Sequence, residues 1–191
     1  MKILLAACNA KYIHSNLAVY DLKAYASAYE DDIFLKEYTI NQTKDEILKD
    51  IYSSRADIVC FSCYIWNISF IEELMEDLPK ILPETIFWAG GPEVSYDGVQ
   101  FLQKAPSMTG VMRGEGEKTF LELADYYIGG KGSLKEIPGI VYRENGEIRD
   151  NGWRELTDLS EIPFVYENLD SFENRIIYYE SSRGCPFSCS Y

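Results

Sequence analysis

Hydrophobic residues in this chain fall into short runs that alternate with longer stretches of mixed polarity. Five of the short runs are nearly continuously apolar at their centres, which is typical of strands covered on both faces of a sheet. We therefore expect β-strands at residues 2–7, 33–38, 57–61, 85–89 and 110–112.

The stretches between these runs have the apolar spacing of helices. In the clearest case Ile68, Ile71, Leu74, Met75 and Leu78 recur at intervals of three and four residues, and the pattern ends before a proline. We expect helices at residues 17–29, 44–53, 67–82, 96–104 and 117–128. Five strand–helix units predict an α/β fold with a doubly wound, parallel five-stranded sheet of the Rossmann-like or flavodoxin-like kind, with strand order 2-1-3-4-5.

The pattern changes after residue 131. Residues 137–148 predict a β-hairpin that turns at Asn145-Gly146, because this dipeptide favours tight hairpin turns. Residues 150–175 have little regular pattern and predict a linker, and the apolar run 176–180 predicts the first strand of another domain. We expect three parts: a domain at 1–131, a hairpin and linker at 132–175, and the start of a further domain at 176–191.

Composition narrows the classes of partner. Of the 191 residues 47% are hydrophobic, which is ordinary for a globular protein, and the net charge is −13. A strongly acidic chain lacks the clustered Lys and Arg that bind nucleic acid or an anionic membrane surface. The first apolar run is broken by Asn9 and Lys11, too early for a signal peptide, so we expect a cytoplasmic protein with cysteines as thiols or metal ligands.

Candidate binding residues follow three of the expected strands. Ligands of open parallel sheets bind beyond the carboxyl ends of the strands, where the strand order reverses. The loops after strands one, three and four should meet there, and glycines or exposed aromatic side chains in them suit a broad, flat ligand. No phosphate-binding glycine motif follows the first strand, which argues against NAD or ATP. The candidate cofactor-binding residues are Asn9, His14, Ser62, Cys63, Tyr64, Gly90, Gly91, Pro92 and Glu93.

Two cysteines near the end of the chain are candidate metal ligands. Cys185 and Cys189 have the spacing of the first two cysteines of a C-x-x-x-C-x-x-C motif, in which three thiolates hold three irons of a 4Fe–4S cluster and leave the fourth iron open. The third cysteine would be residue 192. We therefore expect the chain to be an N-terminal fragment, inactive by itself, of a longer parent enzyme.

Taken together, these motifs resemble one enzyme family. The stretch 183–191, Arg-Gly-Cys-Pro-Phe-Ser-Cys-Ser-Tyr, is similar to the opening of the radical S-adenosylmethionine (radical SAM) cluster motif. Residues 9–17, 89–95 and 113–117 resemble the cobalamin-binding module that precedes the barrel in cobalamin-dependent radical SAM enzymes.

The resemblance implies bound cobalamin in the first domain. In the parent it implies a 4Fe–4S cluster, S-adenosylmethionine, an intramolecular radical SAM barrel as partner, and methyl transfer or related radical chemistry on an unidentified substrate. His14 stands where related cobalamin domains carry a cobalt ligand, but Tyr12 and Leu17 replace the Asp and Gly of that signature. We therefore expect no tight histidine ligand to cobalt.

Two other interpretations remain open. The first domain could be an interaction module that retains the fold but has lost cobalamin, in which case the side chains of Tyr64, Trp66 and Glu93 should fill the cleft. Alternatively, Cys8, Cys60 and Cys63 could hold a second cluster, as in a methylthiotransferase-like enzyme. Cys60 is poorly suited to that role because it lies inside an expected strand.

Overall fold

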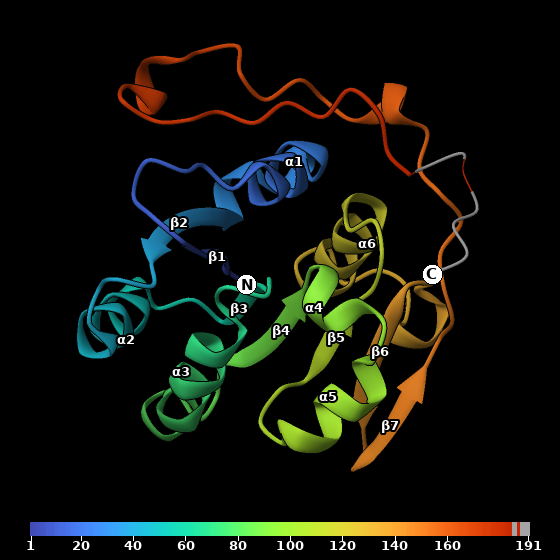
Figure 1. Cartoon of the computed structure of the whole chain (residues 1–191). Coiled ribbons are helices and arrows are strands. Elements are labelled where there is room, and N and C mark those ends of the chain that lie inside the picture. Colours follow the sequence, from blue (N-terminus) through green and yellow to red (C-terminus); the bar gives the residue numbers. More distant parts are fainter. Residues whose placement is uncertain (185–186, 188–191) are drawn as a thin grey trace.

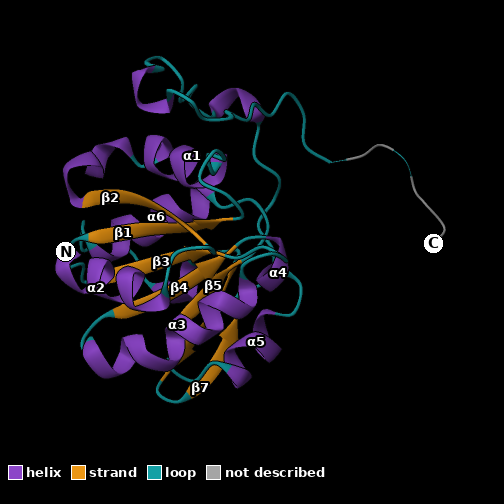
Figure 2. Ribbon diagram, turned by 60° about the vertical axis from the view of Figure 1, so that its left-hand side comes forward, coloured by secondary structure: helices purple, strands orange, loops and turns teal. Residues whose placement is uncertain are grey.

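The computed structural model describes residues 1–184 and residue 187 of the chain. Within these residues, seven strands form one sheet in the order β2-β1-β3-β4-β5-β6-β7 (Figures 1 and 2). The strands are β1 (Ile3–Asn9), β2 (Ile33–Thr39), β3 (Ile58–Ser62), β4 (Ile86–Gly90), β5 (Gly110–Met112), β6 (Ile140–Glu144) and β7 (Glu147–Asp150).

The first five strands are parallel and have the predicted order, so the predicted α/β fold is confirmed. The predicted hairpin also forms, but it extends this sheet, because β6 pairs antiparallel with β5. Asn145 and Gly146 have φ angles of 52° and 85°, as the tight turn between β6 and β7 requires. The sheet therefore has two more strands than the five predicted for the parallel core.

Helices cover both faces of the sheet. On one face α1 (Leu17–Tyr25) and α6 (Glu117–Tyr127) pack on apolar side chains that include Leu5, Trp88 and Tyr142. The other face is covered by α2 (Lys44–Ser54), α3 (Ile68–Ile81) and α5 (Gly98–Lys104), with the short α4 (Pro92–Ser95) between β4 and α5. Each face has its own buried cluster, as expected for a doubly wound sheet.

Some helix limits differ from the prediction. The helix expected at 17–29 ends at Tyr25 and is followed by the 3-10 segment Ser27–Asp32, whose dihedral angles break at Tyr29. The helix expected at 96–104 begins at Gly98, because residues 92–95 form a separate turn of helix. The start of α2 follows from its capping box, in which Thr43 and Glu46 each satisfy a backbone N–H of the other, and the helix ends before Arg55, which has a left-handed φ of 52°.

The segment that follows β7, residues 151–184, is called the strap below. It crosses above α1 (the orange to red chain of Figure 1) and contains two short 3-10 turns, Leu159–Glu161 and Asp170–Phe172. Ile176 exchanges backbone hydrogen bonds with the loop after β1, donating to Ile13 O at 2.5 Å and accepting from Ser15 N at 3.1 Å.

The strand expected at 176–180 does not form among the described residues, and its place as the first strand of a further domain stays a prediction. This stretch makes a single isolated bridge between His14 and Ile176, and among the described residues no further ladder partner runs beside it. An isolated extended segment cannot satisfy its backbone groups as a sheet does. Cys185 and Cys189 lie outside the described residues. No helix among residues 1–184 combines the length and the apolar character needed to cross a bilayer.

Candidate functional site

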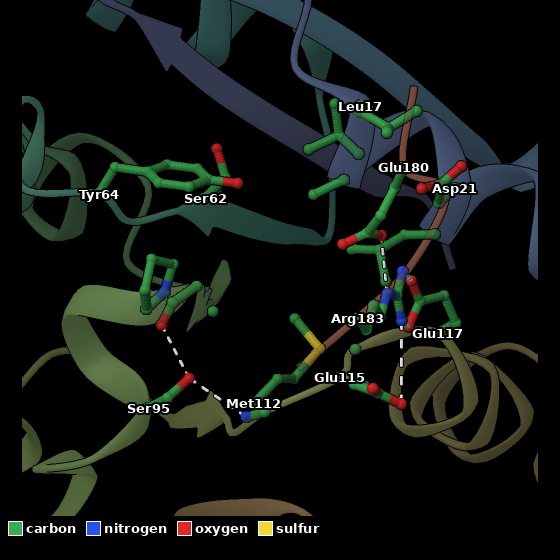
Figure 3. Close-up of a pocket in the computed structure, with 18 of the residues that line it drawn as sticks. Leu17, Asp21, Ser62, Tyr64, Ser95, Met112, Glu115, Glu117, Glu180 and Arg183 are labelled. Carbon is green, nitrogen blue, oxygen red and sulfur yellow. Dashed lines mark hydrogen bonds and ion pairs between the residues drawn. The ribbon is translucent and has the colours of Figure 1, made fainter. Parts of the chain in front are cut away.

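A cavity of about 700 Å³ lies at the carboxyl edge of the sheet, between α1, the loops after β3, β4 and β5, and the end of the strap. This volume is in the range of small-molecule and cofactor sites. Figure 3 shows Ser62 and Tyr64 at one side of it, and Asp21, Glu117 and Arg183 at the other. The cavity is therefore at the predicted carboxyl edge of the sheet, but the loop after β1 does not line it and the loop after β5 does. One side of the cavity is largely neutral and the other is strongly charged.

The glycine pair after β4 forms part of the neutral side. Gly91 has φ 108°, and a Cβ there would lie 2.5 Å from the backbone oxygen of Cys63. A side chain at Gly91 would thus separate two loops that pack backbone to backbone, so the fold itself requires this glycine. A Cβ at Gly90 would only touch Met112 at an ordinary 3.5 Å. Gly90 pairs with Met112 in the parallel ladder, and Met112 lines the cavity, so a larger residue at position 90 would point its side chain to the cavity side of the sheet.

Asn67 fixes the loop after β3. Its side chain is fully buried, donates hydrogen bonds to the backbone oxygens of Cys8 (2.9 Å) and Ser62 (2.8 Å), and accepts one from the backbone N–H of Tyr64 (2.7 Å). This places Tyr64 on the cavity wall, where burial raises the pKa of its hydroxyl. Trp66 stacks on Tyr64 with ring centroids 4.4 Å apart and is 46% exposed.

Ser62 brings a second polar group to this side. Its hydroxyl accepts a hydrogen bond of 3.1 Å from the side-chain amide of the buried Asn16. The amide oxygen of Asn16 is buried and has no hydrogen-bond partner among the described residues. A buried acceptor without a partner is costly in a folded protein. Of this pair only Ser62 lines the cavity, so its hydroxyl is the group that could accept a hydrogen bond from an amide of a ligand.

The charged side contains four carboxylates around one guanidinium. Arg183 contacts Glu117 and Glu180 directly and lies 3.8 Å from Glu115. Asp21 of α1 is 6% exposed, and its pKa is raised to about 7, chiefly by burial and next by the charge of Glu117. Sequence analysis named Glu115 and Glu117 only within the stretch 113–117 that resembles the cobalamin-binding module, whereas the structure shows both side chains on the cavity wall.

Five of the nine predicted cofactor-binding residues line the cavity: Ser62, Tyr64, Gly90, Gly91 and Pro92. The other four do not. Cys63 and Asn9 are buried beside it, and Glu93 is exposed on α4. The Asn9 amide donates to the backbone oxygen of His14 and to the Glu37 carboxylate, both at 2.9 Å. Roles for all nine in cofactor binding stay predictions.

His14 faces the strap. A hydrogen bond of 2.5 Å joins its Nδ1 to the hydroxyl of Tyr178, and the two rings lie 6.0 Å apart. The residue does not line the cavity. In this structure His14 therefore helps to hold residues 176–178, and the expectation that it forms no tight bond to cobalt stays a prediction.

The three cysteines of the sheet domain are not brought together. Cys8 and Cys63 belong to the buried cluster on the α2 and α3 face, and Cys60 belongs to the cluster on the α1 and α6 face. Burial raises the pKa of Cys8 and of Cys60 to about 12, so both thiols stay protonated. Among residues 1–184 no three His, Cys, Asp or Glu side chains are grouped to hold a metal ion. A second cluster at these cysteines is therefore not favoured.

Sequence reasoning missed the part of the wall that the strap supplies. Trp153 and residues 178–183 line the cavity, as does Met112 at the end of β5. Trp153 is held by Arg113, whose guanidinium lies 4.1 Å from the indole ring and pairs with Asp150 at 2.7 Å. One feature of the sequence could have indicated this wall: residues 113–117 place three charged side chains directly after the predicted strand 110–112.

Comparison with known proteins identifies the class. The B12 binding domain family model matches residues 3–124, which is more than half of the chain, and these residues contain the parallel sheet and the neutral side of the cavity. The chain belongs to the B12 binding domain family.

Two proteins of similar sequence and one solved structure also resemble this chain. An uncharacterized methyltransferase of Pyrococcus horikoshii is 36% identical over 120 residues, 59% of this chain and 26% of that protein. The cobalamin-dependent radical SAM methyltransferase TokK of Streptomyces tokunonensis is 28% identical over 146 residues, 71% of this chain and 21% of that protein. The structure of the cobalamin-dependent S-adenosylmethionine radical enzyme OxsB with aqua-cobalamin bound has the same fold, with a TM-score of 0.70 at 19% identity, over 90% of this chain and 25% of that one. The chain thus spans about a quarter of the length of these relatives.

Proposed function

We propose that this chain binds cobalamin in the cavity and serves as the cofactor-binding region of a cobalamin-dependent radical SAM enzyme. The observation that carries the proposal is a cavity of about 700 Å³ at the carboxyl edge of a B12 binding domain, where the strand order reverses. Ser62, Tyr64 and the floor of Gly90 and Gly91 would hold the cofactor.

The residues present fit this group. Cobalamin is a broad ring system whose rim carries amide groups, so its site needs a flat floor, apolar flanks and hydrogen-bonding partners. Gly90 leaves the floor open, Leu22 and Met112 provide apolar flanks, and the hydroxyls of Ser62 and Tyr64 provide hydrogen-bonding partners. When bound, cobalamin supplies a cobalt centre that can carry a methyl group. The chain's own part is to bind and orient it and to exclude water.

Two observations support the radical SAM part of the proposal: the cysteine motif and the similarity to the cobalamin-dependent radical SAM methyltransferase TokK. Cys185 and Cys189 would be two ligands of a 4Fe–4S cluster that binds S-adenosylmethionine, and the relative TokK is named as such an enzyme. We propose a radical SAM barrel of the same protein as the partner of this region, with methyl transfer or related radical chemistry on a substrate that these residues do not specify.

An interaction module without cofactor is the competing function, and the cavity argues against it. That alternative requires the side chains of Tyr64, Trp66 and Glu93 to fill the cleft. Tyr64 lines the cavity without closing it, while Trp66 and Glu93 do not line it. The open volume therefore supports a binding role.

Titration of three proteins with hydroxocobalamin tests the proposal. The variant Gly90→Leu places a side chain on the cavity side of β4 in ordinary contact with Met112. We expect it to fold with an unchanged melting temperature and to bind cobalamin at least about tenfold more weakly, because it occupies the floor of the site. Ser53→Leu adds the same side chain at an exposed position of α2 and should bind as the wild type does. Equal affinities in all three proteins would contradict the assignment of cobalamin to this cavity.

A further inference from the structure

Arg183 is the last charged residue before the cysteine motif, and it is held at the cavity wall. Its guanidinium makes two hydrogen bonds to the Glu117 carboxylate, at 2.5 and 3.1 Å, and one of 2.7 Å to Glu180 (Figure 3). Glu115 lies 3.8 Å away. The Arg183 side chain is only 17% exposed although it belongs to a strap that makes few regular backbone hydrogen bonds.

This contact has the features of a specific anchor. Glu117 is the first residue of α6, and its side chain is 6% exposed, so its charge needs a partner. Arginine presents a planar fork that matches a carboxylate at two points, which a lysine cannot do. Asp21 adds a further buried carboxyl at the same wall. Without Arg183, these acids would face one another with no cation among the groups that contact Glu117.

The position of the anchor links two sites. Glu115, Glu117 and Arg183 all line the proposed cobalamin cavity, and Cys185 follows Arg183 by two residues in the sequence. Whatever holds Arg183 therefore determines where the chain leaves the cavity before the cysteine motif. Residues 178–183 line the cavity and directly precede the cysteine motif in the sequence. A ligand in the cavity would therefore contact the stretch of chain that leads to the motif.

We propose that Arg183 is a positioning residue: anchored by Glu117 and Glu115, it holds residues 178–184 at the wall of the cobalamin cavity and couples cofactor binding to the order of this stretch, which leads in the sequence to the cysteine motif. This inference rests on the proposed function. Since coupling between two sites is reciprocal, cobalamin should order the strap, and loosening the strap should weaken cobalamin binding.

Amide hydrogen exchange of residues 176–184, measured with and without hydroxocobalamin, tests this coupling. In the cofactor-free wild type this stretch should exchange at least about tenfold more slowly than in Arg183→Gln, because the variant loses its anchor. Hydroxocobalamin should slow exchange there further in the wild type and should not do so in Arg183→Gln. Arg183→Lys keeps the charge and should recover part of both effects.

Two further variants make the test specific. Glu117→Gln should reproduce most of the effect of Arg183→Gln, because it removes the two hydrogen bonds between these side chains. The double variant should be no worse than Arg183→Gln, since that variant has already lost this contact. Arg149→Gln, which removes an arginine paired with Glu144 on the hairpin away from the cavity, should behave as the wild type.

The outcomes separate this inference from the function on which it rests. Equal exchange at residues 176–184 in the wild type and in Arg183→Gln overturns the anchor. Slowing by cobalamin that survives in Arg183→Gln overturns the coupling, while cobalamin binding still stands. If the wild-type chain binds no cobalamin, the proposed function and the coupling are both overturned. If exchange is still faster in Arg183→Gln in that case, the anchor alone stands.

Discussion

The sheet domain and the strap, which together build the cavity, are held by different forces. Residues 3–150 form a continuous ladder of strands between two buried apolar clusters. The strap leaves several large apolar side chains exposed, among them Trp153, Leu156 and Phe164. It buries the aromatic rings of Tyr166 and Phe172, and its other contacts with the sheet domain include a few polar ones. The clearest of these are Arg175 with Glu37 at 2.6 Å, Tyr178 with His14, and Arg183 with Glu117.

This difference suggests a division of roles. Burial of apolar surface stabilises the sheet domain whatever the cavity contains. The strap depends on a few ion pairs and hydrogen bonds, so it belongs to the part of a protein that opens most readily. One wall of the cavity is therefore rigid and the other can respond to a ligand.

The largest expected effect comes from the tryptophan of the rigid part. Trp88 is fully buried, and a Cβ at Gly110 would lie 2.4 Å from its ring, so the side chain fills its space completely. Trp88→Ala should lower the free energy of unfolding in urea by about 3–5 kcal/mol. Trp153→Ala is the matched control: this tryptophan is 50% exposed, and its loss should cost less than about 1 kcal/mol. Similar losses in both variants would contradict the contrast between domain and strap.

A smaller effect should appear as a pH dependence at the border of the two regions. The pKa of Asp21 is raised from 3.8 to about 7 by burial and by the charges of Glu117 and Glu180, against the opposing charge of Arg183. A raised carboxyl pKa favours the protonated folded state, so this stabilisation is complete below about pH 4 and is lost as the pH rises through 7.

The variant Asp21→Asn tests this directly. From pH 5 to pH 8 the free energy of unfolding of the wild type should fall by about 2 kcal/mol relative to that of Asp21→Asn, as urea denaturation at each pH would show. Parallel pH profiles of the two proteins would show that Asp21 is ionised from pH 5 to pH 8. The negative charge of the four carboxylates would then be neutralised more fully than their arrangement around Arg183 indicates.

The smallest effect is expected at His14. Its hydrogen bond to Tyr178 is exposed, and His14→Gln should cost less than about 1 kcal/mol. Because His14 does not line the cavity, the visible spectrum of bound cobalamin should be the same in the variant and in the wild type. A spectral change that Tyr178→Phe does not reproduce would show that His14 contacts the cofactor after all.

The same contrast explains how far the sequence could be interpreted. Strands such as 110–112 and the turn at Asn145-Gly146 are specified locally, by runs of apolar residues and by residues that tolerate positive φ, and the structure confirms them. The predicted strand order then placed the cavity at the correct edge of the sheet. The polar residues with binding potential at that edge were identified only where they followed a strand directly, as Ser62 and Tyr64 do.

The remaining part depends on contacts between residues distant in sequence. Glu117 and Arg183 are 66 positions apart, and nothing in either local pattern indicates that they pair. In the sequence Gly91 indicated space for a ligand. In the structure a glycine is required there because φ is positive and a Cβ would collide with the backbone of Cys63. The apolar run at 176–180 has the composition of a strand but no ladder partner among the described residues. Such features follow from tertiary packing, which local propensity does not encode.

The visible spectrum of the wild-type chain, recorded after mixing with hydroxocobalamin and desalting, shows whether the cavity binds cobalamin. We expect a coloured protein fraction that carries about one cobalamin per chain, since the cavity belongs to a single B12 binding domain. A colourless protein fraction from folded chain would contradict this expectation.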